Sequence, residues 1–197
     1  MRFHDALNPI LGSTTKLGLL RTMFASTGRR WTGRELARTS GVSPAQAARD
    51  LAELAETSLV SREVMGSAYS WQLNPSHVLT PVLEELFRRE AGLRSEMLRA
   101  VSEGLRGSKV DRARVFGSIP RGEERDDSDV DLFLQVRTPG ERESAEEAVD
   151  RVRSAVWNRF GNPVSAIIYT RAEVARPRNP ALLKAIEEDG LDVTGGA

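Results

Sequence analysis

One stretch, Arg114 to Val136, limits what this 197-residue chain can fold into more than any other. An apolar strand end is broken by Gly117-Ser118, polar residues follow, and an apolar run resumes after Asp129. Because side chains alternate along a strand, Asp129 and Asp131 share one face. Their apolar neighbours Val130, Leu132, Leu134 and Val136 share the other. The stretch therefore predicts two strands joined by an acidic loop, with paired carboxylates outside the core.

Paired carboxylates indicate a divalent cation, because two adjacent negative charges repel each other without one. Mg²⁺ is held by one or two carboxylates and takes its remaining oxygens from water and substrate phosphates. Gly117 lets the backbone approach a phosphate closely, and Ser118 with the following amides can donate to phosphate oxygens. The alternative is a surface hairpin whose acidic loop is only solvated.

The spacing of these residues carries a resemblance. Gly117-Ser118, ten intervening residues and Asp129-Val130-Asp131 resemble the signature of the DNA polymerase β-like nucleotidyltransferase superfamily in its minimal form. Arg121-Gly122-Glu123 also looks like that family, and the resemblance extends from Val110 to Gly195. It implies Mg²⁺ or Mn²⁺ at Asp129 and Asp131, which would be the catalytic acids. It also implies a nucleoside triphosphate held by Gly117, Ser118 and Arg121.

The sequence departs from this family at the third carboxylate, which the family places on the strand after the long helix. Ser165 stands at that position, and no Asp or Glu occurs between Asp150 and Glu173. A serine hydroxyl is a poor ligand for a hard cation and no base at neutral pH. We therefore expect nucleotide binding with slow or absent transfer, unless Glu173 supplies the missing group.

The first part of the chain predicts three helices and a hairpin. Thr32 with Glu35 forms a capping-box pattern, and Ser43-Pro44 predicts the start of a helix with an apolar stripe. Gln46, Arg49 and Asp50 are expected off that stripe. Residues 13–74 resemble winged helix-turn-helix regulators of the MarR and ArsR type. That resemblance implies DNA contacts by Ser43, Pro44, Gln46, Arg49 and Arg62. A winged helix used for protein contacts is the alternative.

A third apolar pattern, Val78 to Leu105, predicts one long helix whose stripe either packs on the domains or pairs with a second chain. We therefore divide the chain into a winged helix-turn-helix DNA-binding domain (1–77), a linker or dimerisation helix (78–107) and a nucleotidyltransferase-like domain (108–197). Residues 1–77 carry nine Lys and Arg against six Asp and Glu, an excess that favours contact with nucleic acid.

The fold class expected is α+β, with a mixed sheet in the C-terminal α/β domain. No cysteine is present, which excludes disulfides and thiolate-bound zinc, and no apolar run is long enough for a bilayer. We expect a cytoplasmic homodimeric regulator that binds double-stranded DNA, and a nucleoside triphosphate with Mg²⁺. The first alternative is an active transferase that moves a nucleoside monophosphate to a protein or small molecule. Such a transferase could belong to a toxin–antitoxin system. The second is a scaffold of two decayed modules.

Overall fold

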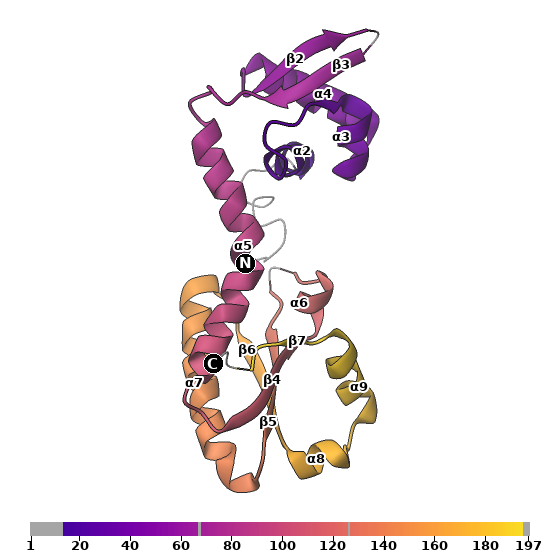
Figure 1. The fold of residues 1–197 in the computed structure, drawn as a ribbon. Helices are drawn as coiled ribbons and strands as arrows, with labels where there is room; N and C mark the ends of the chain where they lie inside the picture. Colours follow the sequence, from indigo (N-terminus) through magenta and orange to yellow (C-terminus); the bar gives the residue numbers. More distant parts are fainter. Residues whose placement is uncertain (1–13, 67, 126, 195–197) are drawn as a thin grey trace. The chain divides into compact units, whose positions relative to one another are not determined.

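The computed structural model describes residues 14–66, 68–125 and 127–194, which form a mixed α/β structure with two sheets. The described residues up to Gly92 form one compact unit, and those from Leu93 onward form a second. Helix α5, Thr80–Leu105, contributes to both (Figure 1). None of the helices within these described ranges is long and apolar enough to cross a membrane.

The first unit contains a three-stranded antiparallel sheet with the strand order β1-β3-β2. Its strands are β1 (Trp31–Thr32), β2 (Val60–Met65) and β3 (Ala68–Leu73). Among the described residues, the helices that precede the hairpin of β2 and β3 are α2 (Thr14–Phe24), α3 (Gly33–Thr39) and α4 (Pro44–Glu56). Trp31 and Trp71 are buried in the core of this unit with Leu19, Leu36 and Leu51.

Local sequence signals account for the starts of α3 and α4. The side chain of Thr32 accepts from the Glu35 amide, and Glu35 returns a hydrogen bond to the Thr32 amide, so the predicted capping box is confirmed. Ser43 accepts from the Gln46 amide, with a proline in the first turn of α4. The prediction for Asp50 was wrong. Its side chain is buried, and its Oδ1 accepts from Gln46 Nε2 at 2.8 Å.

The second unit is built on a four-stranded mixed sheet with the order β6-β5-β4-β7. Strands β4 (Val110–Phe116) and β5 (Val130–Val136) are antiparallel, β6 (Val164–Thr170) is parallel to β5, and β7 (Leu191–Asp192) is antiparallel to β4. The helical elements are α6 (Ser118–Arg121), the 3₁₀ turn η1 (Pro139–Glu141), α7 (Arg142–Phe160), α8 (Arg171–Ala175) and α9 (Pro180–Asp189).

Helices cover both faces of this sheet (Figure 1). On one face, α7 and the second half of α5 pack on Val130, Leu132, Leu134 and Val136, as the alternation predicted. Gly104 lets α5 and α7 approach closely, because a Cβ there would collide with Val152. On the other face, Phe133 packs against Leu183 and Ile186 of α9. Because side chains alternate along β5, Asp131 faces the same side of the sheet as Phe133.

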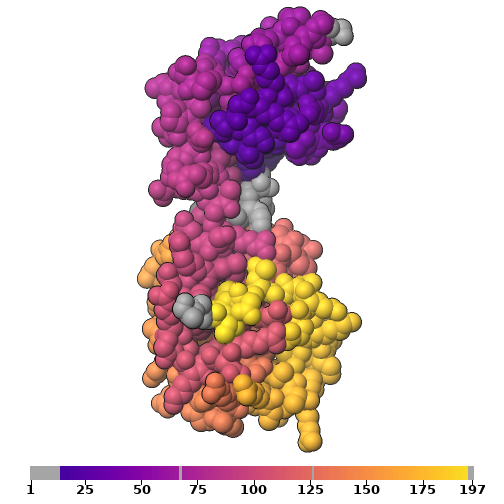
Figure 2. Space-filling view, in the orientation of Figure 1, coloured from indigo at the N-terminus to yellow at the C-terminus, as the bar shows by residue number. Residues whose placement is uncertain are grey.

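The short edge elements were not predicted from the sequence. β7 is two residues long, and it is held to β4 by hydrogen bonds between strands far apart in sequence. The side chain of Arg114 also donates from NH1 to the carbonyl oxygens of Ile186 (2.7 Å) and Glu187 (2.9 Å) at the end of α9. In the space-filling view, the segment coloured yellow, close to the end of the described residues, lies at the surface of this unit (Figure 2).

Candidate functional site

The two acids lie where β5 begins. Asp129 is exposed and immediately precedes the strand, and half-buried Asp131 is its second residue. Asp131 pairs in register with Phe116, the last residue of β4, so the acids lie beside the turn at Gly117-Ser118. The antiparallel pairing of β4 and β5 therefore brings the predicted phosphate-binding turn and the paired carboxylates together.

Gly117 is required by this arrangement on two counts. Its φ of 83° lies in the region that side chains other than glycine rarely adopt. A Cβ at this position would also overlap Oδ2 of Asp131. The carboxylate of Asp131 therefore lies directly against the backbone of the turn, and α6 begins at the next residue, Ser118.

Replacing Gly117 with alanine should destabilise the fold and displace the Asp131 carboxylate. We expect a loss of about 1–3 kcal/mol in the free energy of unfolding, measured by denaturant titration. Gly140→Ala is the matched control, because a Cβ there meets no atom within 4 Å and φ is not positive. Equal stability of the two variants would contradict the role given to Gly117.

Electrostatics at the acid pair favour a cation. Burial raises the pKa of Asp131 above its usual range, the charge of Asp129 raises it further, and Arg121 opposes both. A metal ion between the two carboxylates would remove the cost of this repulsion. The raised pKa of Asp131 thus reflects first its burial and then its repulsion by Asp129, and the charge of Arg121 offsets these only in part.

Ser165 lies beside the acids, as the proposed register required. It pairs with Asp131 across the parallel strands β5 and β6, and its hydroxyl donates to Oδ2 of Asp129 at 2.7 Å. Val164 and Ala166, its neighbours, pack on the opposite face, in and against the main core. The predicted position of residue 165 next to the acid pair is confirmed, and the group present there is a neutral hydroxyl.

The sequence-based alternative that Glu173 replaces the third acid was wrong. Glu173 lies beyond the far end of β6, whereas Ser165 is near its start, about 17 Å of strand away at 3.3–3.4 Å per residue. Its carboxylate accepts from the amide of Thr170 at 2.7 Å and pairs with Arg142 at 2.5 Å. This carboxylate is therefore occupied in capping α8.

Two further residues shape the site. Arg121, at the end of α6, is exposed, and its Nε donates to Glu123 Oε2 at 2.8 Å. Asn162 is buried and donates from Nδ2 to the carbonyl oxygen of Ser128 at 3.0 Å, which anchors the loop just before Asp129. Asn162 was not identified from the sequence, although its position in the Gly161-Asn162-Pro163 turn before β6 is a signal for such a role.

The donor set at this site fits one Mg²⁺ whose other ligands come from a triphosphate and water. Two carboxylates and the glycine turn are available, and a divalent cation of this kind is held by few protein oxygens. Within the described residues, no group of three or more His, Asp or Glu side chains could hold a metal ion. The described residues therefore supply at most part of a metal site, and the remaining ligands would come from the triphosphate and water.

The candidate DNA contacts lie on the first unit. The N-cap Ser43 is exposed, as are Pro44 and Arg49 on the first half of α4, and Gln46 is half-buried. Gln46 links two of its neighbours: its Nε2 donates to buried Asp50, and its Oε1 accepts from Arg49 NH2 at 2.5 Å. Arg62 lies separately on β2, with its guanidinium over the ring of Tyr69 at 4.6 Å.

Comparisons with known proteins identify the second unit. Residues 94–192, half of the chain, match the family model described as a nucleotidyltransferase domain. A comparison with curated proteins gave no match. One similar solved structure is that of TrmBL2, described as an archaeal chromatin protein with a novel mode of DNA binding. It is 18% identical, covers 93% of this chain and 73% of its own, and has a TM-score of 0.32. A TM-score this low does not establish a shared fold.

Proposed function

We propose that this chain, which belongs to the nucleotidyltransferase domain family, is a DNA-binding regulator that binds a nucleoside triphosphate with Mg²⁺ at Gly117, Ser118, Arg121, Asp129 and Asp131. The observation that carries the proposal is the hydrogen bond from Ser165 to Asp129 at 2.7 Å. Among the residues that the structure describes, a neutral hydroxyl thus stands beside the two carboxylates where a third acid is expected. Such a site suits ligand binding better than rapid transfer.

Each residue of the site has a distinct part in binding. Asp129 and Asp131 would hold the cation, which, when bound, neutralises charge on the triphosphate oxygens. Gly117 lets the chain approach the phosphates closely, Ser118 donates to them, and Arg121 adds positive charge. Pro120 has no amide hydrogen, so the turn offers one donor fewer than it would with another residue. Ser165 orients the Asp129 carboxylate and does not take up a proton from an acceptor.

The first unit supports the DNA-binding half of the proposal. Among the described residues, helices α2, α3 and α4, with the short strand β1 between the first two, precede the hairpin of β2 and β3. This order supports a winged helix-turn-helix, in which α4 would enter the major groove. Arg49 is held by Gln46, which is held by buried Asp50, so less side-chain freedom is lost when Arg49 contacts a base. We assign DNA binding to residues 1–77 and nucleotide binding to residues 108–197.

Replacing Arg49 with alanine should weaken specific binding to duplex DNA. A base contact by an arginine side chain is worth about 1–3 kcal/mol. Fluorescence anisotropy with a selected duplex, across a salt series, would measure both the loss and the salt dependence expected of phosphate contacts. Arg99→Ala on α5 is the control, because Arg99 is exposed and lies outside the first unit. If the two variants bound equally well, Arg49 would not be a reader of bases.

The experiment that tests the whole proposal measures duplex affinity with and without triphosphate and Mg²⁺. Regulation requires that the bound nucleotide change the affinity for DNA, and DNA must then change the affinity for nucleotide by the same factor. We expect a reciprocal change of about fivefold or more. Identical duplex affinity under both conditions would show that the nucleotide is not a signal for DNA binding.

We also infer that residues 78–107 serve as a linker and a contact with a second chain. Val78, Leu79 and Val82, just before and within the first turn of α5, are 82%, 51% and 63% exposed. Apolar side chains exposed together mark surfaces that bind partners. A second copy is the partner we propose, because paired winged domains read paired half-sites about one helical turn apart.

A further inference from the structure

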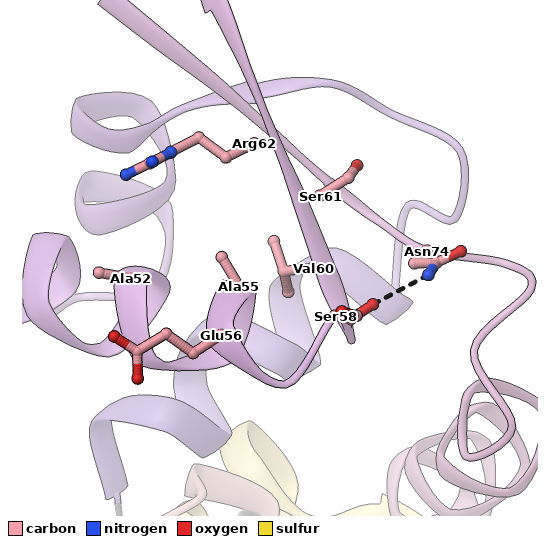
Figure 3. A pocket seen from close by; sticks show the side chains of 8 residues that line it. All are labelled: Ala52, Ala55, Glu56, Ser58, Val60, Ser61, Arg62 and Asn74. Atoms are coloured by element: carbon pink, nitrogen blue, oxygen red, sulfur yellow. Dashed lines mark hydrogen bonds between the residues drawn. The ribbon is translucent and has the colours of Figure 1, made fainter.

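A pocket of about 550 Å³ lies in the first unit, between the second half of α4 and strand β2 (Figure 3). Its volume is that of small-molecule binding sites. Ala52 and Ala55 line it from α4, and Val60 and Arg62 line it from β2. None of these residues belongs to the nucleotide site in the second unit. The pocket is therefore separate from the proposed nucleotide chemistry.

The shape of this pocket is set by small side chains and a fixed loop. Ala52 and Ala55 are half-buried and short, which leaves space next to Val60. The connection between α4 and β2 passes through Ser58, which has a φ of 64°. Asn74 holds this unusual conformation by donating from Nδ2 to the Ser58 carbonyl oxygen at 2.9 Å. One wall is thereby fixed before any ligand binds, which lowers the entropic cost of binding.

Two opposite charges belong to this pocket, Glu56 from the last turn of α4 and Arg62 from β2. Figure 3 shows the Glu56 carboxylate and the Arg62 guanidinium on either side of Ala52. Within the described residues neither forms an ion pair or a side-chain hydrogen bond, although Arg62 lies over the rings of Tyr69 and Trp71. The carboxyl end of α4 adds partial negative charge on the side of Glu56.

We propose that this pocket binds a small zwitterion, with its carboxylate on Arg62 and its ammonium group beside Glu56. An arginine can hold a carboxylate through two parallel hydrogen bonds, and Glu56 with the end of α4 suits a cation. The apolar body of the ligand would lie over Ala52 and Ala55. Aliphatic amino acids and related aminocarboxylates have this combination of groups.

A ligand in this position would join α4 to β2, the two elements that carry the candidate DNA contacts. Arg62 would then be shared between ligand and DNA, so the ligand should lower the affinity for duplex. This consequence rests on the proposed function, whereas ligand binding itself does not. The test of the pocket is therefore made on the full chain without DNA or nucleotide.

Isothermal titration with linear aminocarboxylates, from glycine to aminocaproate, varies the separation of the two charges together with the length of the apolar chain between them. We expect saturable binding that is strongest at one chain length. The N-acetylated and the amidated forms of that compound, which each lack one charge, should bind about tenfold more weakly or worse. Dissociation constants above about 10 mM for the whole series, or equal binding of the singly charged forms, would overturn the proposal.

Single variants test the contribution of each of the two charges of the pocket. Glu56→Gln and Arg62→Gln should each reduce the affinity for the best aminocarboxylate by about tenfold. Glu84→Gln and Arg34→Gln are the controls, because both residues are exposed on the same unit and do not line the pocket. A thermal melt of each variant verifies folding. Undiminished affinity in folded Glu56→Gln and Arg62→Gln proteins would place any binding elsewhere.

Discussion

The double variant Asp129→Asn with Asp131→Asn should lose Mg²⁺-dependent triphosphate binding while its fold becomes more stable. Mg²⁺ binding is lost because the carboxylate ligands are gone, and stability rises because the buried charge of Asp131 and its repulsion by Asp129 are both removed. Burial, followed by the charge of Asp129, raises the pKa of Asp131 in the folded chain. Calorimetry would measure the lost affinity, and a thermal melt of the ligand-free protein would measure the gain in stability.

The same carboxyl group makes the stability of the folded chain depend on pH. Because the folded chain holds a proton on Asp131 more tightly than the unfolded chain, this group favours folding at low pH. Its contribution is lost as the pH rises through the raised pKa. The double variant should lack this dependence. Glu146→Gln with Glu147→Gln, two exposed acids of α7, is the control for charge. Unchanged Mg²⁺-dependent affinity in the aspartate variant would refute the assignment of the site.

Replacing Ser165 with aspartate should convert a binding site into one capable of transfer. The new carboxylate would lie in register with Asp131 and next to Asp129, where it could complete a metal site or accept the proton of an acceptor hydroxyl. General-base catalysis contributes about 10²–10⁴-fold, so we expect at least a 10²-fold increase in transfer of labelled nucleoside monophosphate. Transfer would be measured to the protein itself and to co-purified proteins.

Ser165→Asn is the matched control for size without charge. Asparagine cannot act as a base, so its transfer rate should stay at the wild-type level. Ser165→Asp should also lower the stability of the ligand-free protein, because the hydrogen bond to Asp129 is replaced by repulsion. Rapid transfer by the wild-type chain would instead favour the alternative function, an active transferase, and would mean that the third carboxylate is dispensable.

Much of the second unit could be predicted from periodicity, since β5 and β6 alternate core and site residues in a regular way. The positions of Asp131 and Ser165 follow from that alternation plus the parallel pairing of the strands. What the sequence did not show depends on contacts between distant residues. No local pattern reveals that β7 pairs with β4, or that Arg114 donates hydrogen bonds to carbonyl oxygens of α9. The same holds for the hydrogen bond from Asn162 to Ser128.

The errors have the same physical origin. An aspartate in a helix usually faces solvent, but the packing of α4 in the first unit buries Asp50. Gln46 donates a hydrogen bond to one of its carboxylate oxygens. Glu173 is near Ser165 in sequence, yet a strand separates them, and the helix that follows uses the glutamate as a cap. The proposed zwitterion pocket also depends on tertiary structure, because Glu56 and Arg62 have no notable spacing.

The central claim is that the second unit binds a nucleoside triphosphate through Mg²⁺ and converts it slowly or not at all. Calorimetric titration of the full chain with each triphosphate, with and without Mg²⁺, tests this directly when the nucleotide is recovered and analysed afterwards. We predict saturable binding to at least one triphosphate that requires Mg²⁺, with the nucleotide recovered intact. Absence of Mg²⁺-dependent binding to every triphosphate, or rapid release of pyrophosphate, would contradict the account.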